Sequence, residues 1–158
     1  MVGKSFSLSA NELQLYQPNR YPFLMIDRVT DVMPGKYAIG FKNLTNNEWY
    51  FPKHFENHPN MPGALQLEAM AQMLTVAITT IDGLKGKITH ALEHTVRFKK
   101  EVLPGDRLDI KAELISWKRG IGKGRGICTV EGVEVSSADM TITIPEILER
   151  YLPNNGKI

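Results

Sequence analysis

The segment from Phe51 to Gln72 holds the side chains whose types and spacing can do chemistry. Glu68 lies about two turns inside an apolar stretch rich in strong helix formers. Burying an ionised carboxylate without a partner costs several kcal/mol, so this environment favours the protonated form, which can donate a proton. Gln72 follows four residues later on the same helical face, where its amide can orient the carboxyl group. We therefore expect an acid and a residue that positions it.

Gly63 lies where this helix should begin, directly after Met61 and Pro62. The free N–H groups and the positive dipole end of a helix start can bind an oxygen that gathers negative charge. A thioester carbonyl that turns into an enolate needs such donors, and a base with a pKa of about 7 is needed to take the neighbouring proton. Histidine suits this role, and His54 and His58 precede the helix. The pattern indicates acid–base chemistry beside a carbonyl group.

Two less specific interpretations compete with this one. A single Glu in an apolar helix is more often a structural group whose hydrogen bonds are satisfied. His54 and His58 also fit loop residues or metal ligands, but a metal site needs a third and a fourth ligand. His90 and His94 fall in a predicted strand, without tight Cys/His spacing. We expect no metal ion.

The composition is that of a single globular domain over residues 1–158. The apolar fraction of 42% and the charged fraction of 23% carry no signature of disorder. The net charge of +2 is too small to imply a nucleic-acid partner. The apolar stretch 61–81 approaches membrane-span length, but Glu68 and Gln72 interrupt it, so no span is expected. The single Cys128 and the absence of a secretory h-region at the N-terminus favour the cytoplasm.

The elements that must position these residues follow from hydrophobic periodicity. A helix is predicted from Asn60, as its N-cap, to Asp82. Because it is apolar nearly all the way round, it should be covered on most sides, and a curved sheet wrapped around it would do that. Strands are predicted at 37–44, 88–98, 108–117, 127–130 and 133–144. The order of a few strands, one long buried helix and a run of antiparallel strands is an α+β layout.

A longer motif resembles a known family. The string His-Phe-x-x-His-Pro-x-Met-Pro-Gly-x-Leu-x-x-Glu-Ala-Met-x-Gln, here 54–72, resembles the signature of the bacterial 3-hydroxyacyl-acyl-carrier-protein dehydratases of the FabZ type. Further segments resemble that family in the same order, so the similarity runs from about residue 16 to about residue 144. These segments are 20–29, 96–99, 102–106 and 129–133.

The resemblance implies a hotdog fold, in which an antiparallel sheet wraps one long central helix. It implies dehydration of (3R)-3-hydroxyacyl-acyl-carrier-protein to the trans-2-enoyl product, in fatty acid or related acyl-chain biosynthesis. His54 would withdraw the C2 proton, Glu68 would assist departure of the C3 hydroxyl, and the Gly63 N–H would bind the thioester oxygen. No cofactor is implied, because the phosphopantetheine of acyl carrier protein carries the substrate. Similar members form homodimers with active sites between subunits, some assembled into hexamers as trimers of dimers, so His54 and Glu68 would come from different chains.

Three positions bear on how far the resemblance extends. The related branch that also isomerises its product carries Asp where this chain has Glu68, which favours the branch that only dehydrates. The family usually has His where Asn19 stands and an aliphatic residue where Asn60 stands. Asn60 can cap the helix, or it can face the acyl tunnel and change which chain lengths fit.

A hotdog acyl thioesterase and a non-catalytic acyl-carrier-protein binding partner are the alternative functions.

The densest basic stretch, 118–125, is interspersed with glycines, and a solvated turn is predicted there. Alternatively, basic side chains meet the acidic surface of a carrier protein or the phosphate of its pantetheine arm. The residues that this alternative involves are Lys99, Lys100, Lys118, Arg119, Lys123 and Arg125. The glycines match no complete phosphate-loop pattern, so nucleotide binding is not expected.

Overall fold

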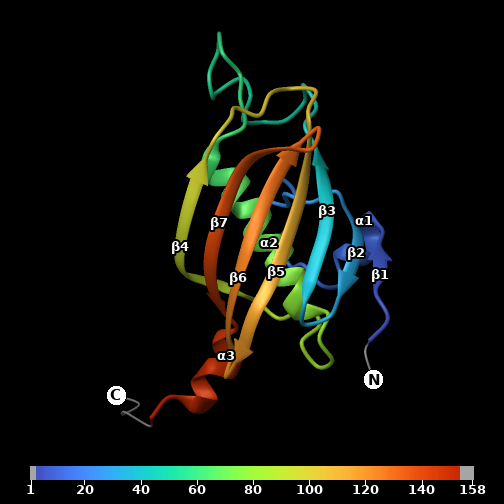
Figure 1. The fold of residues 1–158 in the computed structure, drawn as a ribbon, viewed down its shortest axis with the longest axis vertical. Helices are drawn as coiled ribbons and strands as arrows, with labels where there is room; N and C mark the ends of the chain where they lie inside the picture. Colours follow the sequence, from blue (N-terminus) through green and yellow to red (C-terminus); the bar gives the residue numbers. More distant parts are fainter. Residues whose placement is uncertain (1–2, 154–158) are drawn as a thin grey trace.

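A computed structural model describes residues 3–153, which form one curved antiparallel sheet around a long helix (Figure 1). The strands are β1 (Phe6–Leu8), β2 (Arg28–Met33), β3 (Tyr37–Asn43), β4 (His90–Phe98), β5 (Arg107–Lys118), β6 (Ile121–Val130) and β7 (Val133–Thr143). The helices are α1 (Ala10–Leu13), α2 (Gly63–Thr79), α3 (Pro145–Leu148) and a 3-10 turn at Glu149–Tyr151. Neighbouring strands follow the order β1-β2-β3-β5-β6-β7-β4, so β1 and β4 are the edges. The α+β layout with one wrapped helix is confirmed.

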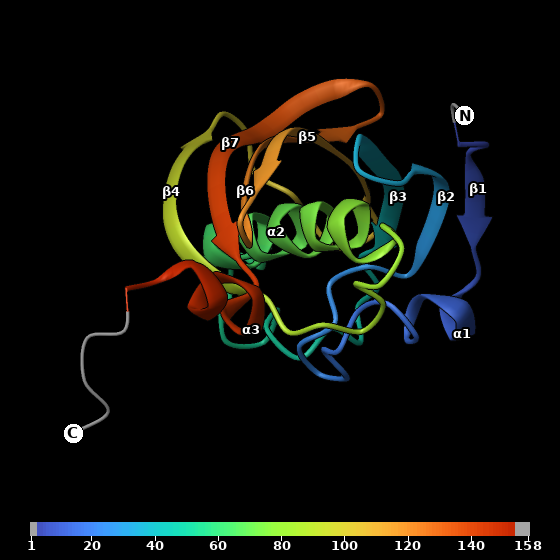
Figure 2. The ribbon, with the colours of Figure 1, turned by 90° about the horizontal axis from the view of Figure 1, so that it is seen from below.

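Helix α2 runs through the hollow of the sheet, as the view from below shows (Figure 2). Twelve of its 17 residues are buried, which agrees with an apolar surface on nearly every side. No helix in residues 3–153 has both the length and the apolar composition that spanning a bilayer requires. The sheet therefore supplies the cover that the composition of this helix demands.

The prediction that Asn60 caps this helix is wrong. The N-cap position is taken by Pro62, which has a φ of −53° and offers no side-chain hydrogen bond. The Asn60 side chain instead donates to the carbonyl of His58 at 3.1 Å. The N–H of Met61 donates to the carbonyl of Val102 at 2.8 Å. Because residues 60 and 61 are held by other segments, the helix begins only after the proline.

The predicted turn at 118–125 is also wrong, because only Arg119 and Gly120 form a turn and β6 begins at Ile121. Three alternating glycines of β6 face helix α2, namely Gly122, Gly124 and Gly126. A Cβ atom at these positions would lie 2.7 Å from Ile78, 2.5 Å from Leu74 and 2.7 Å from Met70, respectively. The glycines thus allow the helix and the strand to approach closely, which is one of the common reasons for glycine within a strand.

Replacing Gly124 with alanine is expected to lower the free energy of unfolding by about 1–3 kcal/mol, because the added methyl group overpacks the contact with α2. The new Cβ would also lie 2.6 Å from the backbone carbonyl oxygen of Glu113, which cannot move aside as a side chain can. Urea denaturation measures the effect. The exposed neighbour Lys123, changed to alanine, is the matched control and should shift stability by no more than about 0.5 kcal/mol. Equal stability of both variants would contradict the close-packing explanation.

Candidate active site

His54 lies in the loop that leads from β3 to α2, and the backbone around it is tightly bonded. Its N–H donates to the carbonyl of Tyr50 at 2.9 Å, and its own carbonyl accepts from the N–H of Asn60 at 2.9 Å. The ring atom Nδ1 lies 3.0 Å from the carbonyl oxygen of Asn60. Because a carbonyl oxygen can only accept, Nδ1 is the protonated nitrogen of the neutral ring, and the lone pair of that ring is on Nε2. The ring of Phe55 stacks on the imidazole at 4.1 Å between centroids, which restricts its orientation.

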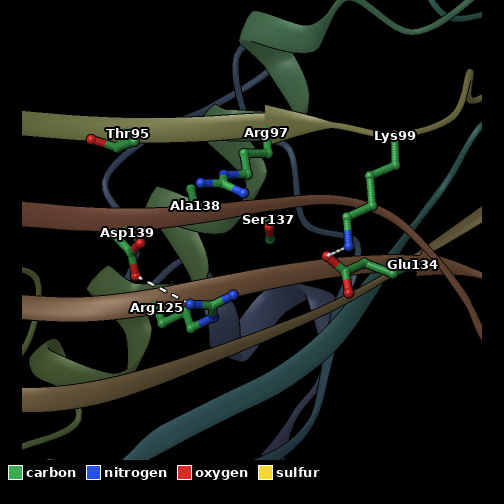
Figure 3. A pocket seen from close by; sticks show the side chains of 8 residues that line it. All are labelled: Thr95, Arg97, Lys99, Arg125, Glu134, Ser137, Ala138 and Asp139. Atoms are coloured by element: carbon green, nitrogen blue, oxygen red, sulfur yellow. Dashed lines mark ion pairs between the residues drawn. The ribbon is translucent and has the colours of Figure 1, made fainter.

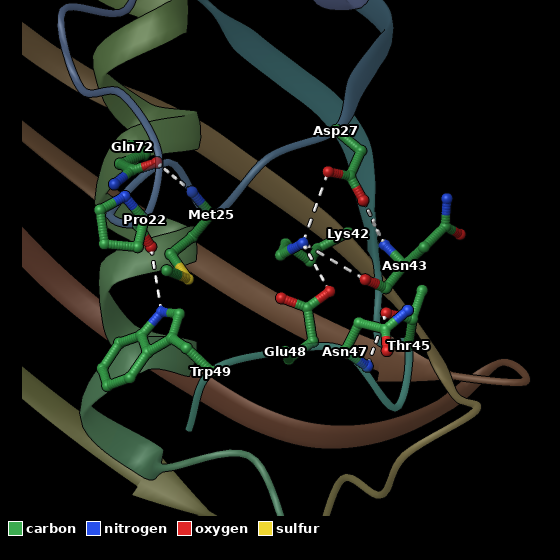
Figure 4. Close-up of polar contacts among 10 residues, drawn as sticks. All are labelled: Pro22, Met25, Asp27, Lys42, Asn43, Thr45, Asn47, Glu48, Trp49 and Gln72. Atoms are coloured by element: carbon green, nitrogen blue, oxygen red, sulfur yellow. Dashed lines mark hydrogen bonds and ion pairs between the residues drawn. The ribbon is translucent and has the colours of Figure 1, made fainter. Parts of the chain in front are cut away.

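Ion pairs around the buried Lys42 anchor this loop to the sheet (Figure 4). The Nζ atom of Lys42, at the end of β3, lies 3.4 Å from a carboxylate oxygen of Asp27 and 3.3 Å from one of Glu48. Lys42 is only 7% exposed, and the two carboxylates compensate for the cost of burying its ammonium group. The indole N–H of Trp49 donates to the carbonyl of Pro22 at 3.2 Å. The histidine loop and the segment around residues 20–27 are thereby held against each other.

Glu68 lies on α2, and its carboxylate is oriented by two amide groups. The Nε2 atom of Gln72 donates to Glu68 Oε1 at 2.7 Å, and the Nδ2 atom of Asn19 reaches the same oxygen at 3.4 Å. Gln72 is itself only 2% exposed. It accepts from the N–H of Met25 at 2.8 Å (Figure 4) and donates to the carbonyl of Phe23 at 2.8 Å. The structure thus brings Glu68 and Gln72 together as their i, i+4 spacing predicts.

The exposure of Glu68 differs from the prediction, and its contact with Asn19 was not predicted. Glu68 is half-buried in the chain and not enclosed, because one face of the first two turns of α2 is left uncovered. The contact with Asn19 joins residues 49 positions apart in the chain, and no local spacing rule links that extended segment to a helix face. Both amides bind Oε1, and among the described residues Oε2 has no hydrogen-bond partner. The second oxygen is therefore the one free to meet a substrate.

Gly63 is the first residue of α2, so its N–H has no acceptor within the helix. A Cβ atom here would lie 2.7 Å from the ring of Phe98, so the aromatic ring occupies the space that a side chain would need. A groove of about 560 Å³ runs past Gly63, Asn60, Phe98, Lys99 and Lys100. The helix start thus opens to a groove with basic side chains, although its glycine also has a packing role.

His54 and Glu68 share no direct polar contact within one chain. No hydrogen bond or ion pair in the described part of the chain joins His54 to Glu68. The groove at the helix start does not include Glu68, which lines a separate small cavity between α2 and β4.

The six basic residues expected to meet a carrier protein fall into separate groups. Lys99 and Lys100 directly follow β4, at the end of the sheet where α2 begins, whereas Lys118 and Arg119 lie at the opposite end, where β5 turns into β6 (Figure 1). Arg125 lies on the outer face of the sheet beside a groove of about 310 Å³ (Figure 3). The remaining member, Lys123, is exposed on β6.

Ion pairs already engage part of this basic set. Lys99 pairs with Glu134 at 2.8 Å and Arg125 with Asp139 at 3.6 Å, as Figure 3 shows. The six residues therefore do not form one surface. Lys99 and Lys100 are the two that border the groove at the helix start.

Neither a metal centre nor a thiol nucleophile emerges from the described residues. Residues 3–153 contain no group of three or more His, Cys, Asp or Glu side chains placed to hold a metal ion. His90 and His94 lie on strand β4, as predicted. Cys128 is fully buried, and burial raises the pKa of its thiol to about 12, so the reactive thiolate is scarce at neutral pH.

Comparison with known proteins agrees with this architecture. Solved structures of similar fold include the dehydratase heterocomplex ApeI:P from Xenorhabdus doucetiae, with a TM-score of 0.74, 18% identity, and coverage of 88% of this chain and 95% of that one. The protein Cj0977 from Campylobacter jejuni gives a TM-score of 0.67 at 11% identity, covering 85% and 89% of the two chains. At such low identity these neighbours show the fold alone. The antiparallel sheet wrapped around one central helix is a hotdog fold.

The sequence comparisons define the family more narrowly. The model of the FabA-like domain matches residues 17–139, and the chain belongs to this family. The 3-hydroxyacyl-acyl-carrier-protein dehydratase FabZ of Bacillus subtilis is 41% identical over 140 residues, which cover 88% of this chain and 99% of that protein. The protein of the same name from Clostridium novyi is 39% identical over 139 residues, covering 87% and 98%. The family resemblance seen in the motif is confirmed.

Proposed function

We propose that this chain is a 3-hydroxyacyl-acyl-carrier-protein dehydratase that forms trans-2-enoyl thioesters in fatty acid or related acyl-chain biosynthesis, in the cytoplasm. The proposal is carried by the sequence identity of 39% and 41% to relatives of that name, over 87% and 88% of this chain, together with the oriented Glu68 on α2. The substrate would be bound to the phosphopantetheine arm of acyl carrier protein, and no cofactor would be needed. Lys99 and Lys100, beside the helix start, are suited to meet an acidic carrier surface.

In this mechanism Nε2 of His54 removes a proton from C2 of the substrate. The electrons of that C–H bond form the C2–C3 double bond, and the C3–O bond breaks. Glu68 donates its proton through Oε2, so that the hydroxyl group leaves as water. The Gly63 N–H, which lacks an acceptor in the helix, would stabilise the negative charge on the thioester oxygen. Gln72 would act as a positioning residue, because it binds the other carboxylate oxygen.

The proposal includes a homodimer whose active sites lie between the subunits. It is supported by the family resemblance and by the position of β4 at the edge of the sheet, where one side of the strand has no neighbouring strand among the described residues. Leu92 and Phe98 on this strand are about half exposed, at 52% and 51%, which is unusual for large apolar side chains on an edge. A second copy of the chain would cover them. Light scattering would distinguish a dimer from a hexamer made of three dimers.

The test is a direct assay with 3-hydroxyacyl carrier proteins of increasing chain length. Dehydration is followed by the loss of water in the mass spectrum and by enoyl absorbance, and hydration is followed from the enoyl side. We expect reversible interconversion and no release of free thiol. Free thiol without loss of water would instead identify a thioesterase, the main alternative among hotdog proteins. Carrier binding without either reaction would identify a non-catalytic partner.

A further inference from the structure

The basic stretch at residues 118–125, to which the proposed function gives no role, borders a groove at the far end of the sheet from the start of α2 (Figure 1). The groove has a volume of about 520 Å³ and lies beside α3, where β5 turns into β6. Its lining residues are Ser116, Lys118, Arg119, Ile121, Lys123, Leu148 and Tyr151. None of them lines the groove at the helix start or belongs to the edge strand β4. The groove is therefore separate from the candidate active site and from the strand that the proposed dimer covers.

The walls of this groove are packed against each other. The carbonyl oxygen of Gly120, in the turn between β5 and β6, accepts from the N–H of Ile144 and from the hydroxyl group of Thr143, both at 2.8 Å. A Cβ atom at Gly120 would lie 2.6 Å from the backbone nitrogen of Leu148, so α3 packs directly on the turn. The turn and the helix thus form one rigid unit. A preformed site of this kind loses less conformational entropy when a ligand binds.

Three cations meet in this groove, and none forms an ion pair with another residue in the range 3–153. Lys118 and Lys123 lie on neighbouring strands, two positions apart in register, and Arg119 lies at the turn. No acidic side chain lines the groove. The other basic residues of β5 and β6 all pair with carboxylates, namely Arg107 with Asp109 at 2.9 Å, Lys111 with Glu113 at 2.7 Å and Arg125 with Asp139 at 3.6 Å. Because like charges repel, three cations without a counter-ion favour an anionic ligand.

The shape and the aromatic lining narrow the class of this anion. A concave volume of roughly 300–1,000 Å³ is typical of small-molecule sites, whereas a protein partner usually covers roughly 800 Å² of surface. Lys and Arg side chains are common partners of phosphate groups. The ring of Tyr151 is near the Arg119 guanidinium group, at 5.7 Å, and the residue is 57% exposed, so a planar group of a ligand can pack on it. Leu148 and Ile121 add apolar contacts.

We propose that this groove binds a small phosphate ester that carries an aromatic ring, such as a nucleotide, with its phosphate held by the three cations and its ring packed on Tyr151. Side-chain cations hold the phosphate in place of a glycine-rich loop, which agrees with the lack of a phosphate-loop pattern in the sequence. The site lies apart from the candidate active site, so the proposal does not depend on the proposed function.

Isothermal titration calorimetry of the full chain with adenosine diphosphate, at an ionic strength of about 0.15 M, tests the site. Arg119→Asn should weaken binding by about tenfold or more, the usual effect of losing a hydrogen bond to a charged group. Arg119 has a φ of 53°, which Asn adopts more readily than Arg, so this variant should fold at least as well as the wild type. Arg125→Gln removes the same charge beside a different groove and is the matched control. Its affinity should stay within about twofold of the wild type, because salt screens exposed charges that do not touch the ligand.

A second variant tests the aromatic contact separately from the charges. Tyr151→Leu should weaken the binding of adenosine diphosphate by about fivefold, because the packing of two rings is lost. Inorganic pyrophosphate has no ring, so its affinity should be the same for this variant and for the wild type. Tyr151 is exposed in a 3-10 turn, and its replacement leaves the packed core intact.

Three results would overturn the proposal. If the wild-type chain bound no adenosine diphosphate at millimolar concentration, the groove would be a solvated surface. If Arg119→Asn and Arg125→Gln lost the same affinity, the overall positive charge and not this groove would attract the anion. If the chain sedimented with phosphatidylglycerol vesicles but bound no adenosine diphosphate, the basic groove would be a contact for a membrane surface and not a small-molecule site.

Discussion

Replacing His54 with alanine, or Glu68 with glutamine, is expected to lower the rate of dehydration by about 10²–10⁴-fold, the usual contribution of a positioned acid or base. The alanine variant lacks the Nε2 atom that would take the C2 proton. The glutamine variant keeps the shape of Glu68 and an acceptor for the amide of Gln72, but it cannot transfer a proton to the leaving hydroxyl group. Enoyl absorbance with a carrier-bound substrate measures both rates.

Each of these variants has a matched control nearby in the chain. His58 is four residues from His54, and its Nε2 atom forms an exposed pair with Glu101 at 2.7 Å. Exposed pairs of this kind contribute little to stability, so His58→Ala should retain most of the activity. Glu56, exposed in the same loop, is the control for Glu68. The acid–base assignment would be wrong if the control variants lost as much activity as His54→Ala and Glu68→Gln.

Two inactive variants are expected to restore activity when they assemble together. If each site takes His54 from one subunit and Glu68 from the other, a chain with His54→Ala still supplies an intact Glu68, and a chain with Glu68→Gln supplies an intact His54. In an equal mixture that assembles at random, about one quarter of the sites combine both intact residues. This fraction is the same for a dimer and for a hexamer of three dimers.

Co-expression of the two variants with different tags, followed by the dehydration assay, measures this recovery. About one quarter of the wild-type rate is expected, against the residual rate of either variant alone. A double variant with both changes in one chain, co-expressed with the wild type, calibrates the assembly. If His54 and Glu68 acted within the same chain, the mixture would stay as inactive as its components, and the proposal of sites between subunits would be refuted.

The amino-acid sequence alone predicted the long helix, the antiparallel strands and the histidine–glutamate motif, because these depend on residues that are close together in the chain. The long apolar helix, its cover by an antiparallel sheet and the i, i+4 pair of Glu68 and Gln72 follow from periodicity and helical geometry. The histidine loop before the helix also follows from the linear motif, and residues that are neighbours in the chain stay neighbours in the fold.

Only the tertiary structure decided the features in which distant segments meet. Gly122, Gly124 and Gly126 carry a local turn signal, yet they lie in strand β6, where α2 packs too close for a Cβ atom. Asn60 is a good cap by residue type, but its neighbours are bonded to other segments, and the helix starts after Pro62. The amide of Asn19, from an extended segment, and the side chain of His94, from strand β4, reach the surroundings of Glu68. Such contacts depend on how the chain closes on itself, and no short window of sequence contains both partners.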